Sequence, residues 1–254
     1  MRALLPSKLA SLALLLGAAW AAPAQAENKP VEVTWYGHAT FLVRSASGTT
    51  LLIDPFISQN PKTPADKKDI SKLRPDAILV THSHFDHTVD AVAIAKASKA
   101  KVIGAFDFVA TPDVPDDQKA GGNVGGVIAV KDVKVHLVPA MHGSVPGGRP
   151  LGFVVEFGDG RRLYHTGDTW IFGDMALIEE IHHPDIILLQ AGGGPFNQQP
   201  EVAKRALDKY FKPSIVVPMH YGTWPVLATE ETVKKAFGAD PRVQIMQAGQ
   251  TRTF

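Results

Sequence analysis

The sequence predicts a single domain of the α+β class, in which β-sheets are faced by helices. Most of the chain consists of short β-rich runs separated by Gly and Pro, and a few stretches carry apolar residues at helical spacing. Strands and helices alternate in groups, and neither a repeat of fixed period nor a long polar linker divides the chain. With 254 residues, 45% of them hydrophobic, the chain is long enough to bury a core.

The individual elements follow from this pattern in order along the chain. Strands are expected at residues 31–36, 40–44, 50–53, 77–81, 101–104, 126–130, 133–138, 152–157, 162–166, 186–190 and 214–219. Helices are expected at residues 88–99, 174–182, 200–210 and 229–237. In the first helix Val89, Val92, Ala93 and Ala97 recur at helical spacing, and Pro200 suits the first turn of the third. The polar stretch 58–72 is expected to be a loop.

The first 26 residues have the pattern of a secretory signal peptide. Arg2 and Lys8 accompany an apolar run of about twelve residues, which ends in the small-residue site Ala24-Gln25-Ala26. Because a bilayer-spanning helix needs about 20 apolar residues, cleavage after Ala26 is favoured over a retained anchor. The mature domain, residues 27–254, is therefore expected in the periplasm or outside the cell, without a stable membrane anchor.

Charge and cysteine content restrict the function further. Without Arg2 and Lys8, 24 of the 26 basic residues remain against 25 acidic residues, so the mature chain lacks the basic excess typical of nucleic-acid binding. We therefore expect a small-molecule substrate and no nucleic acid, and a homo-oligomer is left open. The chain contains no cysteine. A metal site would have to use His, Asp and Glu.

The stretch T-H-S-H-F-D-H concentrates metal-ligand residue types. Its candidate ligands are His82, His84, Asp86 and His87. His82 and His84 are two residues apart, so in an extended loop they point to the same side and can share one ion. Asp86 and His87 fall where a helix is expected to begin, which turns them toward a second position. The stretch alone supplies too few groups for two ions.

Other polar residues also follow expected strands, each beside a glycine or another small residue. These residues are His38, His142, Asp168 and His220. Two ions about 3.5–4 Å apart need six or seven protein ligands. His142 can complete a first site and His220 a second, while Asp168 can bridge both. A structural zinc site, which usually closes with four ligands, is the alternative.

The pattern H-x-H-x-D-H, followed by His142, Asp168 and His220, resembles the metallo-β-lactamase superfamily. The surroundings look closer to its small metal-dependent hydrolase branch, which is ascorbate-6-phosphate-lactonase-like and of the UPF0173 type. The similar segments are WYGHATFLV, LLIDPF, AILVTHSHFDH, GGNVGG, VPAMH, YHTGDT, FGDM and PMHYGTWP. The resemblance implies a four-layer αββα sandwich with a dinuclear site at one edge. By position, the first ion takes His82, His84 and His142, the second takes Asp86, His87 and His220, and Asp168 bridges them.

The expected activity is metal-dependent hydrolysis of a small ester, lactone or phosphoester. Two divalent ions, zinc first with manganese or iron as alternatives, would turn a shared water into a hydroxide nucleophile near neutral pH. Asp86 would both bind metal and orient that hydroxide. The further catalytic candidates are His38 as a donor to substrate, His165 and Tyr221, with packing as the alternative for the last two. Buried Asp54 is expected to orient a ligand loop.

Two departures from the branch restrict what the resemblance implies. The segment LLQAGGGPFNQQPE stands where related proteins often have a PIGG-like segment, so their substrate preference is not carried over. The signal peptide is the second departure, because many members of the branch look cytoplasmic. The alternatives are a secreted β-lactamase or other amide hydrolase, a nuclease, and a non-catalytic metal- or ligand-binding protein. Asp168 argues against the first, because lactamases of this superfamily have Cys or Ser at that point. The charge balance argues against the nuclease, and the intact ligand set argues against the binding protein.

Overall fold

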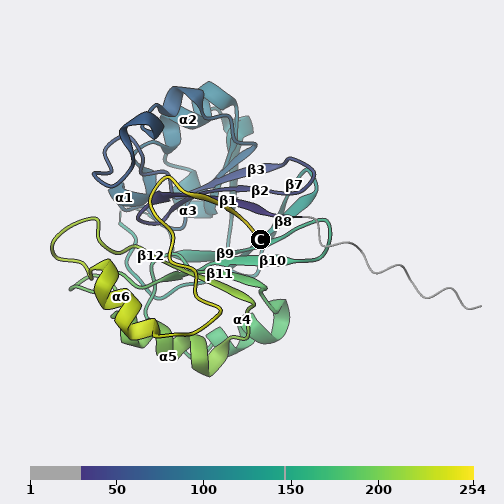
Figure 1. The fold of residues 1–254 in the computed structure, drawn as a ribbon. Coiled ribbons are helices and arrows are strands. Elements are labelled where there is room, and N and C mark those ends of the chain that lie inside the picture. The colour runs from purple at the N-terminus through teal and green to yellow at the C-terminus, as the bar shows by residue number, and fades with distance from the viewer. Residues whose placement is uncertain (1–29, 146) are drawn as a thin grey trace, which may run out of the picture.

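Two mixed β-sheets lie face to face in the computed structural model, which describes residues 30–145 and 147–254 (Figure 1). The first sheet has the order β13-β1-β2-β3-β4-β5-β6 and the second the order β12-β11-β10-β9-β8-β7. The first sheet contains β1 (Glu32–Gly37), β2 (Thr40–Arg44), β3 (Thr50–Ile53), β4 (Ala77–Leu79), β5 (Lys101–Ala105), β6 (Lys119–Gly122) and β13 (Thr251–Thr253). The second contains β7 (Val127–Val130), β8 (Val133–Pro139), β9 (Leu151–Glu156), β10 (Arg162–His165), β11 (Ile186–Gln190) and β12 (Ile215–Met219). The expected signal peptide, residues 1–26, lies outside the described residues.

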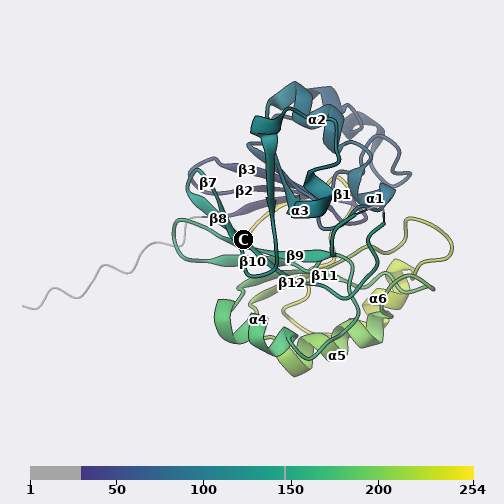
Figure 2. The ribbon, with the colours of Figure 1, turned by 180° about the vertical axis from the view of Figure 1, so that it is seen from behind.

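Helices cover the outer face of each sheet, as the views from both sides show (Figures 1 and 2). The helices are α1 (Phe85–Thr88), α2 (Ala91–Ser98), α3 (Phe106–Val109), α4 (Met175–His182), α5 (Pro200–Tyr210) and α6 (Glu230–Phe237). Helix α2 packs on β4 and β5, and α4, α5 and α6 lie below the second sheet. This arrangement confirms the expected αββα sandwich. None of the described helices combines the length and apolar character needed to cross a bilayer.

The central strands are buried on both faces because each has the other sheet on one side and helices on the other. All residues of β3, β4 and β11 are buried, whereas the edge strand β7 and the short β13 are largely exposed. Strands buried on both faces read as continuous apolar runs, which is the pattern of TLLI, AIL and IILLQ. One buried apolar cluster draws on both sheets and on the helices that face them.

Every strand expected from the sequence is present, with ends that differ by a residue or two, and the expected helices differ in one place. Instead of one helix over 88–99, α1 begins at Phe85 and α2 restarts at Ala91. The break occurs because the Asp90 amide donates to the carbonyl oxygen of Pro55 at 3.2 Å and does not continue the hydrogen bonds of α1. The Asp90 carboxylate also accepts hydrogen bonds from the amides of Ile57 and Ser58. Within the expected loop 58–72 there are only two short 3-10 turns, η1 (Ala65–Lys67) and η2 (Ile70–Lys72).

Three elements have no expected counterpart, namely β6, β13 and α3. Strand β6 reads KAGG, which lacks the β-branched and aromatic residues typical of strands. At Gly121 a Cβ atom would come within 2.9 Å of the Phe106 Cα, so the glycine lets α3 pack against this strand. The three-residue β13 pairs antiparallel with β1. All three elements are too short, or too rich in glycine, for periodicity to reveal them.

The turn after β10 depends on Gly167. Its φ angle is +60°, and an added Cβ would press on the carbonyl oxygen of Leu151 and lie 3.1 Å from the Thr81 Cβ. Leu151 and Thr81 come from different sheets and are joined by a hydrogen bond of 2.9 Å between the Leu151 amide and the Thr81 carbonyl. The turn therefore fits closely where the two sheets meet.

We expect the Gly167→Ala substitution to lower the free energy of unfolding by about 2–4 kcal/mol, because left-handed strain and a backbone clash both act there. Gly160→Ala is the matched control, since Gly160 also has a positive φ but nothing lies within 4 Å of its added Cβ. The control should cost only about 1 kcal/mol. Urea unfolding followed by circular dichroism measures both values, and equal losses would show that crowding at Gly167 is unimportant.

Candidate metal centre

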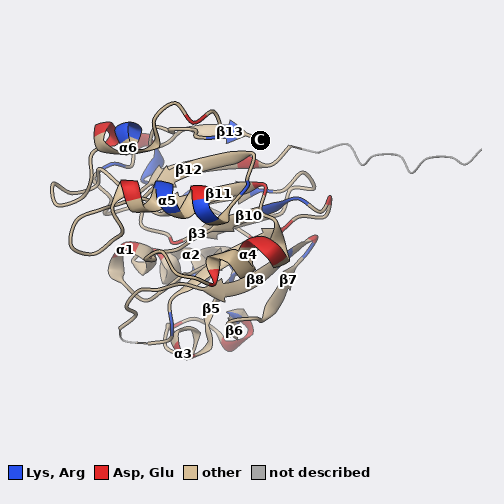
Figure 3. Cartoon of the chain, turned by 90° about the horizontal axis from the view of Figure 1, so that it is seen from below, with Lys and Arg blue, Asp and Glu red and all other residues tan. Residues whose placement is uncertain are grey.

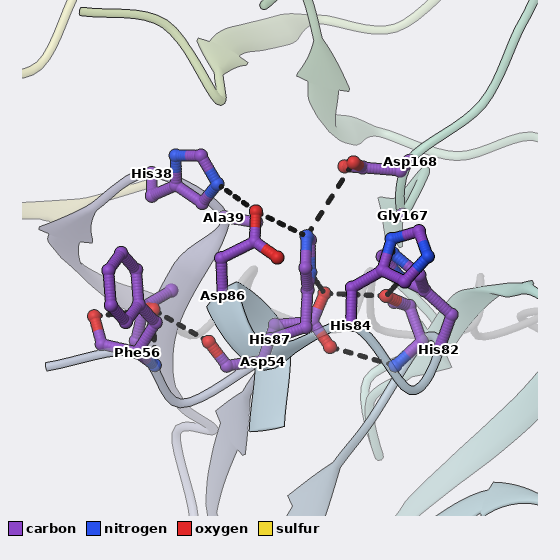
Figure 4. A network of polar contacts seen from close by, with 12 residues as sticks. His38, Ala39, Asp54, Phe56, His82, His84, Asp86, His87, Gly167 and Asp168 are labelled. Atoms are coloured by element: carbon purple, nitrogen blue, oxygen red, sulfur yellow. Dashed lines mark hydrogen bonds and ion pairs between the residues drawn. The ribbon is translucent and has the colours of Figure 1, made fainter. Parts of the chain in front are cut away.

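The candidate ligands meet because the strands that deliver them run in the same direction. Strands β3 and β4 are parallel, as are β10, β11 and β12. Strand β2 is antiparallel to both β1 and β3, so β1 runs in the direction of β3. Strand β9 is antiparallel to both β8 and β10, so β8 runs in the direction of β10. The residues that follow these strand ends are His38, Asp54, His82, His142, Asp168 and His220. They therefore emerge together at one edge of the sandwich. Figure 4 shows His38, Asp54, His82 and Asp168 there.

His82, His84 and His142 form the first group. Each offers a ring nitrogen, and these atoms lie within 4.8 Å of one another. The Nε2 of His82 and the Nδ1 of His84 are 2.9 Å apart, and the His142 ring lies about 5 Å from both rings. His82 is buried while His84 and His142 are half-buried, so the first group borders solvent.

Asp86, His87 and His220 form the second group, and His38 lies against it. Asp86 Oδ2 is 3.8 Å from His87 Nε2 and 3.7 Å from His220 Nε2. The same oxygen accepts a hydrogen bond from His38 Nε2 at 3.0 Å. Ligand atoms from all four residues again fall within 4.8 Å of one another.

Asp168 lies between the two groups. Its Oδ2 is 3.7 Å from His142 Nε2 in the first group, 3.6 Å from His87 Nε2 and 3.1 Å from His220 Nε2 in the second. Asp168 is 3% exposed, and its Oδ1 has no hydrogen-bond partner among the described residues. The arrangement brings together all seven residues expected to hold metal, with Asp168 in the bridging position.

The atoms without partners fit divalent cations. His87 Nε2, His220 Nε2 and Asp168 Oδ1 are all buried and lack hydrogen-bond partners in the described part of the chain. A buried polar atom without a partner is costly, and a divalent cation would satisfy these three. Imidazole nitrogens with carboxylate oxygens are a suitable donor set for zinc, manganese or iron. The residues present therefore fit divalent metal ions.

Hydrogen bonds behind the centre set which nitrogen of each ring faces it. Asp54 is fully buried, and its Oδ2 accepts from His87 Nδ1 at 2.8 Å and from Thr81 Oγ1 at 2.7 Å. Thr81 Oγ1 in turn accepts from His82 Nδ1 at 3.1 Å. Both rings thus turn Nε2 toward the centre, as metal-binding histidines do. The expected role of Asp54 in orienting a ligand agrees with this contact.

The protonation states of the centre follow from burial and mutual charge. Burial, together with the charge of His87, holds the pKa of His82 well below its usual range, and burial lowers the pKa of His142. These rings are therefore neutral, which is the state that binds metal. Burial opposes the charged forms of His87 and Asp168. The charges of Asp168 and Asp54 nevertheless hold the pKa of His87 well above its usual range. The charges of His220 and His87 hold the pKa of Asp168 well below its usual range.

His38 is placed to orient Asp86 and not to act as a free donor. Its ring is fully buried, with Nδ1 2.8 Å from Thr223 Oγ1 and Nε2 committed to Asp86. Burial, and then the charge of His220, lower the pKa of His38 to about 3, so the ring is neutral. It therefore donates from Nε2 to Asp86 and accepts at Nδ1 from Thr223. Both ring nitrogens are thus engaged with the chain, and the expected contact with substrate stays a prediction.

His165 and Tyr221 do not have the geometry of the expected catalytic groups. His165 Nε2 donates to the Ala39 carbonyl at 2.9 Å and Nδ1 accepts from the Gly167 amide at 3.1 Å, so no ring nitrogen is free. Its contacts join the turns that carry His38 and Asp168. Tyr221 lines a cavity of about 450 Å³ together with Trp35 and His38, and among the described residues its hydroxyl has no hydrogen-bond partner.

Three polar residues near the centre were not singled out from the sequence. Thr81 and Thr223 contact His82 and His38, as described above. Asn197 lies in the segment LLQAGGGPFNQQPE, and its amide nitrogen is 3.1 Å from His220 Nδ1. Asn197 comes a few residues after β11, at the same edge of the sheet. The sequence signal that could have identified Asn197 is its position after a strand end, beyond the glycines of the loop.

Comparisons with known proteins show the family of the chain. The family described as Beta-lactamase superfamily domain matches residues 32–220. A UPF0173 metal-dependent hydrolase of Myxococcus xanthus is 43% identical over 220 residues, covering 83% of this chain and 77% of that protein. Another, from Thermococcus kodakarensis, is 39% identical over 227 residues, covering 87% and 98%.

Solved structures give the same result for the fold. Igni18, described as a novel metallo hydrolase from Ignicoccus hospitalis, has a TM-score of 0.79 and 32% identity, and covers 89% of this chain and 98% of that chain. An isothiocyanate hydrolase from Delia radicum gut bacteria has a TM-score of 0.67 at 19% identity, which supports the fold alone, over 88% and 98% of the two chains. The chain belongs to the metallo-β-lactamase superfamily, among its UPF0173 metal-dependent hydrolases.

Proposed function

We propose that this metal-dependent hydrolase is exported and cleaves a small ester, lactone or phosphoester at a centre of two divalent ions, zinc before manganese or iron. The observation that carries the proposal is the position of Asp168, whose Oδ2 lies within 3.7 Å of His142, His87 and His220. One carboxylate that faces histidines of both groups suits two ions better than one. When bound, the ions would supply a Lewis acid and an activated water near neutral pH.

Some residues of the chain would hold the ions, and others would orient those ligands. We assign the first ion to His82, His84 and His142, the second to Asp86, His87 and His220, and the bridge to Asp168. Asp54 and Thr81 fix the ring nitrogens that face the centre. The half-buried rings of His84 and His142 leave the approach to the centre open on their side.

Asp86 has a second role toward the attacking water. Burial opposes its charged form, but the hydrogen bond from His38 and the charges of His87 and His220 hold the pKa of Asp86 well below its usual range. The carboxylate therefore stays ionised and accepts a hydrogen bond from water. Because His38 holds Oδ2 at 3.0 Å, the acceptor is kept in one orientation. Fixed orientation lowers the entropic cost of reaching the reactive geometry.

Removal of metal should abolish hydrolysis by more than about a hundredfold and lower the melting temperature, because ions that bind only the folded state stabilise it. Dialysis against a chelator, followed by addition of zinc, manganese or iron, tests this with a panel of esters, lactones, phosphoesters and a reporter cephalosporin. Elemental analysis should give two ions per chain in the wild type and fewer in Asp168→Ala. Turnover in the fully metal-free protein would refute the mechanism, and a preference for the cephalosporin would favour a β-lactamase.

Asp54→Asn should weaken metal binding by about 10–100-fold, because the amide replaces the carboxylate that accepts from both His87 and Thr81. The matched control is Asp90→Asn, which also alters a buried carboxylate but one bonded to the amides of Ile57 and Ser58. Competition with a metal-binding dye measures both affinities. Equal metal affinities in the two variants would show that the Asp54 carboxylate does not strengthen metal binding by His87.

Export should be visible as loss of the first 26 residues. We expect the protein from the periplasm or medium to begin at Glu27, because the Ala24-Gln25-Ala26 site follows an apolar run of suitable length. Mass spectrometry of cell fractions measures the end of the mature chain. A full-length chain found in the membrane fraction would indicate a retained anchor instead, and a full-length cytoplasmic chain would refute export.

A further inference from the structure

Large apolar side chains surround the opening of the metal centre and are exposed to solvent. We call this set the apolar rim. Its members, between 50% and 67% exposed, are Phe85, Met141, Trp170, Phe196 and Val226. Single exposed apolar residues are common on protein surfaces, but a set gathered around one site indicates a binding surface.

One side of the rim is aromatic. The Phe85 ring lies 5.9 Å from the rings of Phe56 and Trp224, and the Trp224 ring lies 5.0 Å from that of His38. Phe85 is also the residue between His84 and Asp86. This aromatic side therefore stands directly beside the second group of ligands.

The opposite side is formed by Met141 and Trp170. The Trp170 amide donates to the Met141 carbonyl at 3.0 Å, and the Met141 amide donates to Thr169 Oγ1 at 2.9 Å. Met141 precedes His142, and Trp170 follows Asp168 by two residues. These two side chains thus border the approach beside the half-buried His142.

A third side comes from two loops that are bonded to each other. Phe196 precedes Asn197, which contacts His220. The Ala228 amide donates to the Gly192 carbonyl at 2.7 Å, and an added Cβ at Gly194 would press on Val226. Phe196 and Val226 therefore project from neighbouring loops next to the second group.

Among the described residues, no Lys or Arg side chain pairs with the carboxylates of the centre. Every ion pair of Asp86 and Asp168 is with a histidine. In Figure 3 the loops beside α1 are mostly tan, whereas charged residues are coloured on α4, α5 and α6 and also near β6, β7 and β13. Recognition of a phosphoryl group usually uses Arg or Lys. The surroundings suit an uncharged substrate.

We propose that the substrate is an uncharged ester or lactone with a bulky apolar acyl, alkyl or aryl group, which binds to the apolar rim while the ester reaches the metal centre. This inference rests on the proposed hydrolase function and narrows it by setting phosphoesters aside. Burial of each additional methylene at the rim should raise kcat/KM by up to about fourfold. The gain should come from a lower KM, because the apolar group binds in the same way before and during reaction.

The test is a chain-length series with the mature, metal-loaded protein. The substrates are p-nitrophenyl acetate, butyrate, hexanoate and octanoate, γ-lactones of increasing alkyl length, and p-nitrophenyl phosphate. We expect kcat/KM to rise about two- to fourfold per methylene and the phosphate to be the poorest substrate. Trp170→Ser and Phe196→Ser should flatten the series. Leu177→Ser, an equally exposed apolar residue on α4 and outside the rim, should leave the slope as in the wild type.

The outcomes separate this inference from the proposed function. A flat series or a preference for the phosphate would overturn the inference and leave a hydrolase. If no substrate is turned over, the proposed function is refuted for these substrates. Binding of the unreactive ketone 2-undecanone, followed by tryptophan fluorescence, still tests whether the apolar rim binds an apolar group. Binding weakened by Trp170→Ser and Phe196→Ser but not by Leu177→Ser would support it, and absent binding would overturn it. A flat series together with cosedimentation on phosphatidylcholine vesicles would assign the rim to a membrane surface.

Discussion

The buried carboxylate of Asp54 is the contact on which the candidate centre depends. It follows β3, is fully buried, and accepts hydrogen bonds from the Thr81 amide and hydroxyl and from His87. A buried charge is tolerated only when several donors surround it, so these contacts must all form together. In forming, they fix the end of β4 against the end of β3 and turn His87 Nε2 toward Asp168. One interaction thereby sets the local fold and the direction of a ligand.

The centre also depends on how the two sheets meet, because each supplies part of it. Residues 38 to 87 come from the first sheet, while His142, Asp168 and His220 follow strands of the second. Three contacts close this seam at the same edge: His220 amide to His38 carbonyl, Leu151 amide to Thr81 carbonyl, and His165 to Ala39. The distances between ligands are therefore as rigid as the core between the sheets, where β4 and β11 are buried on both faces.

The sequence revealed the strands and the candidate ligands because both have local signals. Continuous apolar runs mark doubly buried strands, and a polar residue beside a glycine marks their ends. The roles of His38, His165 and Tyr221 were not accessible in this way, because they depend on partners far along the chain. His38 binds Thr223, 185 residues away, and His165 binds Ala39, 126 residues away. The break between α1 and α2 has the same origin, since it is set by Pro55 and not by helical spacing.

The proposed chemistry and the proposed selectivity come from neighbouring residues of the same strand ends. The ligands are held by buried partners, whereas the apolar rim uses residues next to them in the chain, such as Phe85 and Met141, whose side chains are largely exposed. The segment LLQAGGGPFNQQPE joins both functions, because Asn197 contacts His220 while its neighbour Phe196 is 67% exposed. The sequence predicts that the chain departs from the pattern of its branch at this segment. In the proposed mechanism, a change there would alter the surface that meets the substrate while the seven candidate ligands stay in place, so a shared reaction is compatible with different substrates.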